Sequence, residues 1–208
     1  MLPRTPAALA IAVLALLAGC SGTAGPSFTV PYVGPADVDV DTPALREAKA
    51  AAGIEDCPRP AGGTGSGDLP AVTLPCLGGG RSVDLSTLRG PMVVSVWAQS
   101  CVPCATEMPV LQAFHEEHGD EVPLLGIDFQ DVQVDAALEF VADRGATYPQ
   151  LADVGGETRD ARLAPGRFGL PLLVLVDEDG RYAYRGLEII DSTGELEELV
   201  AEHLGLLL

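Results

Sequence analysis

The stretch WAQSCVPCATEMP, residues 97–109, places two cysteines, Cys101 and Cys104, three positions apart. The preceding run MVVSVW is short, apolar and β-branched, which predicts a buried strand. A helix is expected to follow from about residue 102 to residue 118, with Pro109 kinking it. The two cysteines therefore stand at the junction of a buried strand and the N-terminus of a helix.

Cysteines at this spacing face each other across one helical turn, so they can form and break a disulfide without backbone movement. The partial positive charge of the helix N-terminus favours a thiolate, which makes Cys101 the expected nucleophile. The alternatives are a structural disulfide and half of a zinc site. Zinc would require further ligands, and the sequence has no second CxxC motif or suitably spaced histidine pair, so no metal site is expected.

Other side chains close to the motif have both ordinary and functional interpretations. Trp97 is expected to be a core aromatic rather than a substrate contact. His115 and His118 have glutamates between them, and we expect a solvated helix face there rather than a metal site. Glu107 shares roughly one helix face with both cysteines. It is either an exposed acid in the early turns of the helix or a buried acid beside a thiol.

The N-terminus, MLPRTPAALAIAVLALLAGC, has one basic residue and then an apolar run over residues 7–18. This run is too short to span about 30 Å of hydrocarbon as a helix, so it is interpreted as an export signal. Its end, LAGC, resembles the lipobox of bacterial lipoproteins, whose cysteine is lipidated; the alternative is an ordinary signal with a chance cysteine. We predict a signal peptide over residues 1–19 and an anchor at Cys20, on the extracytoplasmic face of the cell membrane, where disulfides persist.

The composition bounds the partners and the organisation of the chain. Acidic residues outnumber basic ones by 30 to 12, for a formal net charge of −18. This charge serves general solubility and argues against nucleic acid or anionic headgroups as partners. Residues 20–67 are expected to be a tether with a short alanine-rich helix, capped by Thr42, and a glycine-rich linker. Residues 68–208 form the main domain.

The main domain alternates strand and helix signals, which predicts an α/β fold with a mixed sheet covered by helices on both faces. A hairpin turning at Gly78, Gly79 and Gly80 opens it. The remaining signals are a strand in VPLLGIDF, a helix in VDAALEFVADRG, two strands around a tight turn in PLLVLVDEDGRYAYRG, and a helix in STGELEELVAEHL with a capping-box spacing.

The CxxC stretch, Leu170-Pro171 before a strand, and VDEDGRYAYRG together resemble the TlpA/ResA branch of thioredoxin-like, membrane-tethered thiol–disulfide oxidoreductases, over about residues 68–205. The resemblance implies a thioredoxin-like fold in which Cys101 is the exposed attacking thiol and Cys104 the buried resolving one. It also implies that Pro171 is a cis-proline facing the disulfide and Glu107 a buried acid below Cys104. Members commonly have an aromatic residue directly before the first cysteine. Serine stands there in this chain, which leaves the shape of the substrate groove open.

By this resemblance, the chain uses no cofactor and reduces disulfides in exported proteins, and a membrane dithiol donor such as a DsbD/CcdA-like protein resets it. Pro103, the second residue between the cysteines, resembles the reducing members, among them those acting in cytochrome c maturation. Two alternatives stay open: a dithiol oxidase for secreted proteins, and a copper(I)-carrying domain that uses the same two thiols. Met108 is the one further soft ligand near the pair. We expect a monomer.

Cys57 and Cys76 remain once the lipidation site and the CxxC pair are set aside. A disulfide between them would close a loop of about 20 residues and contribute roughly 3 kcal/mol in the chain-entropy model. We therefore predict a structural disulfide that pins the linker to the hairpin. A second redox relay is the alternative.

Overall fold

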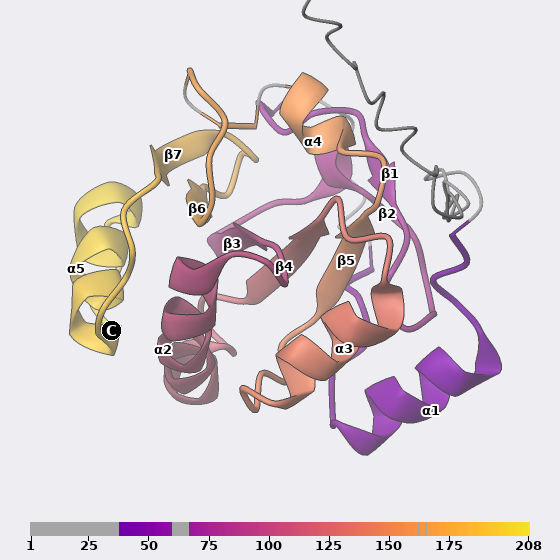
Figure 1. The fold of residues 1–208 in the computed structure, drawn as a ribbon. Coiled ribbons are helices and arrows are strands. Elements are labelled where there is room, and N and C mark those ends of the chain that lie inside the picture. Colours follow the sequence, from indigo (N-terminus) through magenta and orange to yellow (C-terminus); the bar gives the residue numbers. More distant parts are fainter. Residues whose placement is uncertain (1–37, 60–66, 162, 165) are drawn as a thin grey trace, which may run out of the picture. The chain divides into compact units, whose positions relative to one another are not determined.

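The structure is a computed structural model, which describes all residues except 1–37, 60–66, 162 and 165 (Figure 1). The predicted signal peptide, the predicted lipidation site Cys20 and about half of the predicted tether lie outside the described residues. Among the described residues, no helix has the length and hydrophobicity needed to cross a bilayer.

A five-stranded mixed sheet forms the centre of the fold, with strand order β5-β4-β3-β6-β7. Strands β3, β4 and β5 are parallel, whereas β6 runs antiparallel to β3 and β7 antiparallel to β6. The predicted mixed sheet with flanking helices is confirmed. The strands are β3 (Met92–Trp97), β4 (Leu124–Phe129), β5 (Gln150–Asp153), β6 (Leu172–Val176) and β7 (Tyr182–Gly186).

The two faces of the sheet are covered unequally. Residues of four helices share one core cluster with the sheet face that carries Val93 and Trp97. The other face, which carries Val94 and Val96, packs mainly against the N-terminal hairpin and the segment after a short helix. The sequence analysis predicted helices on both faces of the sheet. In the structure the N-terminal hairpin covers much of the second face. The helices are α1 (Pro43–Ala51), α2 (Val102–His118), α3 (Val134–Ala142), α4 (Glu157–Asp160) and α5 (Thr193–Leu204).

The N-terminal hairpin consists of β1 (Thr73–Leu74) and β2 (Val83–Asp84), which pair antiparallel. The connection turns through three consecutive glycines, as predicted. Gly78, Gly79 and Gly80 have φ angles of 73°, 91° and 115°, a backbone region that residues with a Cβ rarely adopt. A short 3-10 turn, Leu85–Thr87, follows the hairpin.

Helix α1 begins as its sequence predicts, since the Thr42 side chain accepts a hydrogen bond from the Leu45 backbone N–H at 3.2 Å. Leu45 and Ile54 lie in the same core cluster as the sheet, and α1 contacts α3 (Figure 1). The sequence analysis assigned this helix to the tether. Its cap and its alanine content predict a helix, but they do not indicate whether the helix packs against the main domain. In the structure, the compact unit includes α1.

Candidate functional site

The CxxC motif lies at the C-terminal end of β3, at the point where the chain enters α2. Cys101 is the N-cap residue of this 17-residue helix, and its Sγ accepts a hydrogen bond from the Cys104 backbone N–H at 3.2 Å. The two cysteines form a disulfide. Cys101 is partly exposed and Cys104 is buried, whereas Val102 between them is 78% exposed. A partner protein can therefore reach the first sulfur, but not the second.

The position of Cys101 favours a thiolate once the disulfide is reduced. The first turn of α2 contains no acidic residue, so no carboxylate there opposes the positive end of the helix dipole. The Cys104 N–H that now points at Cys101 Sγ can donate to a thiolate in the same place. Both effects lower the pKa of a thiol at a helix N-terminus.

Glu107 lies one turn beyond Cys104, and its side chain is buried, which excludes the exposed-acid interpretation. Burial raises the pKa of Glu107 to about 7. The Ile190 backbone N–H donates to Oε1 at 3.0 Å and lowers the pKa, but not enough to offset burial. The neighbouring carboxylates of Glu195 and Asp191 raise it further. A carboxyl group with this pKa can both accept and return a proton near neutral pH.

Pro171 precedes β6, and its peptide bond with Leu170 is cis. Leu172, the first residue of β6, pairs with Val96 of β3. Pro171 therefore lies at the start of β6, next to the C-terminal end of β3, where the loop to Cys101 begins.

A family model described as AhpC/TSA matches residues 67–198. The chain belongs to the AhpC/TSA family. One relative is the thiol:disulfide interchange protein DsbE of Pseudomonas fluorescens, 32% identical over 139 residues, which are 66% of this chain and 75% of the relative. Another is the thiol-disulfide oxidoreductase ResA of Halalkalibacterium halodurans, 26% identical over 130 residues, 62% of this chain and 69% of the relative.

Solved structures show the same fold. MTB DsbF superimposes with a TM-score of 0.57 at 29% identity, covering 67% of this chain and 98% of the solved one. A DsbF homologue from Corynebacterium diphtheriae gives 0.55 at 25% identity, covering 72% and 99%. The predicted thioredoxin-like fold and the resemblance to thiol–disulfide oxidoreductases of the TlpA/ResA type are confirmed.

The loop that leads to Cys101 in this AhpC/TSA-family protein is held by an acid that the sequence analysis missed. Asp131 accepts a hydrogen bond from the Gln99 backbone N–H at 2.7 Å. Next to Asp131 lies Asp128, a buried acid of β4. Burial is the largest cause that raises the pKa of Asp128 well above its ordinary value, and the nearby carboxyl groups of Asp131 and Asp153 add to it. Both carboxylate oxygens of Asp128 are buried without a hydrogen-bond partner among the described residues, so this site favours the neutral form of the acid.

Trp97 is buried, in agreement with its expected place in the core. Its ring stacks on Phe140 with 5.2 Å between centroids, and its Nε1 donates to Gln150 Oε1 at 2.9 Å. Gln150 is buried in β5, a strand that the sequence analysis did not predict. The tryptophan thus ties the end of β3 to α3 and β5, immediately before the loop that carries the cysteines.

The two histidines of α2 are engaged with carboxylates. His115 Nε2 lies 3.0 Å from Glu55 Oε1, and His118 Nε2 lies 3.1 Å from Glu197 Oε1. Glu117, His118 and Glu197 are the one group among the described residues whose ligand atoms come within 4.8 Å of one another. These side chains are exposed or partly exposed, and such acidic groups are common on protein surfaces without a metal ion.

Proposed function

We propose that Cys101 and Cys104 are the redox centre of an extracytoplasmic thiol–disulfide oxidoreductase that reduces disulfides in exported proteins. The observation that carries this proposal is the difference in exposure between the two cysteines. One is accessible at a helix N-terminus, and the other is buried one turn further along the helix. The relatives named DsbE and ResA support the reducing direction.

The reaction begins with the reduced enzyme. The Cys101 thiolate attacks one sulfur of a substrate disulfide, a mixed disulfide forms, and the other substrate sulfur leaves as a thiolate. Cys104 then loses its proton and attacks Cys101 Sγ, which releases the second substrate thiolate. Two electrons pass from the enzyme pair to the substrate, and the enzyme is left with the disulfide seen in the structure.

Glu107 is proposed as the group that takes the Cys104 proton. Cys104 is buried, so its proton must pass to a protein group or to water that enters the site. Glu107 is buried on the same helix, and its pKa of about 7 leaves a fraction of the carboxylate ready to accept a proton at neutral pH. The reverse transfer serves the step in which a dithiol donor reduces the enzyme.

Pro171 is proposed to face the disulfide and to shape the surface against which the substrate chain lies. Its place at the start of β6, beside the C-terminal end of β3, supports this role. Ser100 stands where an aromatic residue is common in the family, and it contributes to the same surface.

The setting of the enzyme is also a proposal. Lipidated Cys20 would hold the domain at the outer face of the cell membrane, and a membrane dithiol donor such as a DsbD/CcdA-like protein would return the pair to the reduced form. Cytochrome c maturation is the proposed context, since it requires reduced thiols on exported chains. Cys57 and Cys76, which are bonded in the structure, would staple α1 to the hairpin.

The reduction potential of the Cys101–Cys104 pair decides the direction. A reductase should lie nearer to thioredoxin, at about −270 mV, than to the oxidant DsbA, at about −120 mV. Equilibration with glutathione mixtures, followed by acid quenching and alkylation, measures it. A value above roughly −180 mV would favour a dithiol oxidase. Stoichiometric copper(I) binding that survives competition by glutathione would instead favour the carrier.

A further inference from the structure

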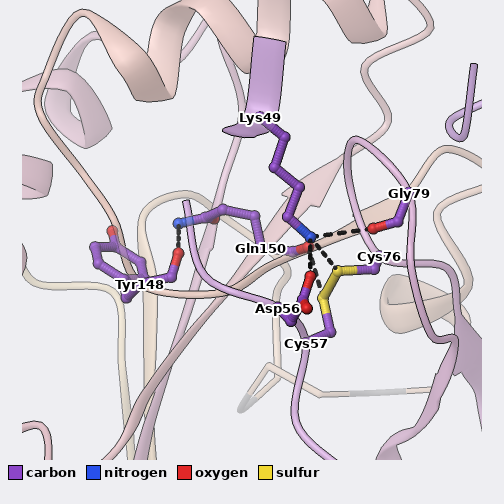
Figure 2. Close-up of a disulfide and its surroundings, with 7 residues drawn as sticks. All are labelled: Lys49, Asp56, Cys57, Cys76, Gly79, Tyr148 and Gln150. Atoms are coloured by element: carbon purple, nitrogen blue, oxygen red, sulfur yellow. Dashed lines mark hydrogen bonds and ion pairs between the residues drawn. A yellow bond between two sulfur atoms is a disulfide. The ribbon is translucent and has the colours of Figure 1, made fainter. Parts of the chain in front are cut away.

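Lys49 is the only lysine of the chain, and it is buried beside the disulfide between Cys57 and Cys76 (Figure 2). It projects from α1, and its side chain is 6% exposed. Its Nζ lies 3.2 Å from Cys76 Sγ and 3.0 Å from the carbonyl oxygen of Gly79. A positive charge thus reaches one sulfur of a pair that the sequence analysis predicted to be structural, with a redox relay as the alternative.

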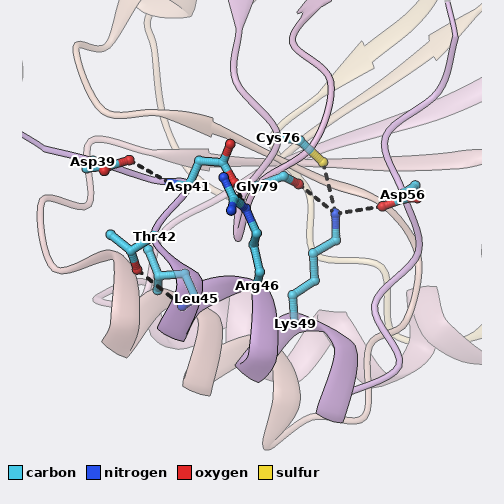
Figure 3. A network of polar contacts seen from close by, with 9 residues as sticks. All are labelled: Asp39, Asp41, Thr42, Leu45, Arg46, Lys49, Asp56, Cys76 and Gly79. Atoms are coloured by element: carbon cyan, nitrogen blue, oxygen red, sulfur yellow. Dashed lines mark hydrogen bonds and ion pairs between the residues drawn. The ribbon is translucent and has the colours of Figure 1, made fainter.

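The Lys49 ammonium is only weakly compensated in the oxidised protein. Asp56 Oδ1 lies 3.3 Å from Nζ, but the Asp56 side chain is 96% exposed, so water screens this ion pair (Figure 3). Gly79 contributes a neutral carbonyl, and a disulfide sulfur is a weak acceptor. Burying a charge is costly unless an opposite charge or strong hydrogen bonds compensate it. A thiolate at Cys76 would provide that opposite charge.

The second sulfur has a partner of a different kind. Cys57 Sγ lies 3.2 Å from the backbone carbonyl oxygen of Gln150. A disulfide sulfur has no proton to donate, but a reduced thiol on Cys57 could donate to this oxygen once the two sulfurs have separated. The surroundings therefore suit a thiol at Cys57 and a thiolate at Cys76. A disulfide that serves only as a staple requires neither partner.

We propose that the Cys57–Cys76 disulfide is a second redox-active centre, whose reduced form is a thiol at Cys57 and a thiolate at Cys76 held by Lys49. The reductant is a protein or small-molecule dithiol. Its first thiolate attacks Cys57 Sγ, the disulfide breaks, and Cys76 leaves as a thiolate. The second donor thiol then attacks the mixed disulfide, and Cys57 leaves and takes a proton. Two electrons and one proton reach the protein, and the donor becomes a disulfide.

Access agrees with this order of events. Cys57 is 6% exposed and Cys76 is 1% exposed, so Cys57 is the easier sulfur to attack. A cavity of about 330 Å³ opens at Lys49; Arg46, Asp56 and Gly80 also line it, and the two cysteines lie behind this lining. A lysine beside a cysteine lowers the thiol pKa and makes the thiolate a better leaving group.

The proton count distinguishes this centre from a staple that is merely reducible. Full-length protein is equilibrated with mixtures of reduced and oxidised dithiothreitol from pH 6 to pH 7.5, quenched with acid, alkylated, digested with trypsin and mapped by mass. In the wild type the tryptic peptide of residues 50–81 carries Cys57 and Cys76, because Arg59 precedes proline, and the CxxC pair lies on a separate peptide. Without a lysine or arginine at position 49, the corresponding peptide is residues 47–81. Dithiothreitol releases two protons on oxidation while this pair takes up one. The equilibrium constant for reduction of the Cys57–Cys76 disulfide by dithiothreitol should therefore rise about tenfold per pH unit.

Lys49→Met keeps the apolar stem and removes the charge. In this variant the pair should take up two protons, so the equilibrium constant should lose its pH dependence. At pH 7 the equilibrium constant of the variant should be about tenfold lower than that of the wild type. This corresponds to a reduction potential about 30 mV lower for a two-electron couple. Lys49→Arg, which keeps a charge, should restore part of the slope. Arg46→Gln is the matched control, since it removes a positive charge of the same helix that pairs with Asp41 instead.

The charged groups around the pair are the same in all these chains, apart from the residue changed. They are Lys49, Asp56, the Arg46–Asp41 pair, and His115, which holds Glu55 at 3.0 Å. The contributions of these unchanged groups therefore cancel when variants are compared. With glutathione as a monothiol probe, the mixed disulfide should map to Cys57. A wild-type equilibrium without pH dependence, or a pair that stays oxidised where dithiothreitol fully reduces Cys101 and Cys104, would overturn the proposal.

Discussion

Position on a single helix gives the cysteines of the CxxC motif different chemistry. Cys101 caps α2 and is partly exposed, whereas Cys104 is buried against the core. The spacing and the expected helix N-terminus were enough to predict a pair and to propose its nucleophile, because helix geometry and the helix dipole are local properties. The burial of Glu107 was open from local sequence, since it depends on the segment around Ile190, more than 80 residues away along the chain.

Substitution of each cysteine should separate the two steps of the reaction. Cys101→Ser should abolish disulfide exchange, because the accessible thiolate is lost. Cys104→Ser should leave the first attack intact and accumulate mixed disulfides with substrates, which mass spectrometry can identify. In the reduced wild type, Cys101 should be alkylated first at neutral pH. Faster labelling of Cys104 would reverse the two roles.

Glu107→Gln should slow the resolution of the mixed disulfide. Glutamine keeps the size of the side chain and an oxygen for the Ile190 N–H, but it cannot take a proton. Loss of a general base typically lowers a rate by about 100-fold or more. In stopped-flow reduction of a model disulfide, the wild-type rate of resolution should rise as pH passes about 7, where Glu107 ionises. Equal rates in the two proteins from pH 5 to pH 9 would leave Glu107 without a part in proton transfer.

At the level of elements, apolar runs and helix caps predicted most of the strands and helices. The sequence analysis missed strand β5 and the packing of α1 against the core. Strands β3, β4 and β6 are apolar runs that are buried throughout, so composition predicts them. Strand β5 is equally buried but contains Gln150 and Asp153. The hydrogen bond that Gln150 accepts from Trp97, 53 residues away along the chain, cannot be inferred from a local window. The docking of α1 was missed because one buried leucine in an alanine-rich helix does not indicate what the helix packs against.

Helix α1 should contribute to the stability of the domain. Leu45 is buried in the core cluster shared with the sheet, so Leu45→Ala should lower the free energy of unfolding by about 2–5 kcal/mol. Glu47→Ala is the matched control on an exposed face of the same helix and should change it by less than about 0.5 kcal/mol. Urea denaturation of the oxidised proteins measures both. Identical transitions for the two variants would indicate a helix that does not stabilise the domain.

On the scale of the whole molecule, the family match and the compact unit do not coincide. The AhpC/TSA match begins at residue 67, whereas the core reaches back to α1. The segment between Ile54 and Cys57 joins that helix to the hairpin through the disulfide, and Cys57 Sγ lies 3.2 Å from the carbonyl oxygen of Gln150 in β5. The part outside the family match thus brings its own cysteine, Cys57, and the only lysine to a place that the shared fold already occupies.

Glu107 also couples the stability of the whole fold to pH. Burial raises its pKa from 4.5 to about 7. Between these values the unfolded chain has released a proton that the folded protein still holds, so the free energy of unfolding falls as pH rises. The contribution of this group is complete below pH 4.5, is lost as pH rises toward 7, and is constant above it. The interval between the two pKa values corresponds to about 3 kcal/mol.

Glu107→Gln isolates this contribution, because every other titrating group is common to the two proteins and glutamine does not ionise. Denaturation of the oxidised proteins at pH 4.5 and at pH 7.5 gives the free energy of unfolding of each. Relative to the variant, the wild type should lose about 3 kcal/mol between the two pH values, since only the wild type must bury a carboxylate at the higher pH. A difference between the proteins that stays constant over this range would mean that Glu107 ionises equally easily in the folded and unfolded chain. The buried acid would then have no raised pKa with which to serve Cys104.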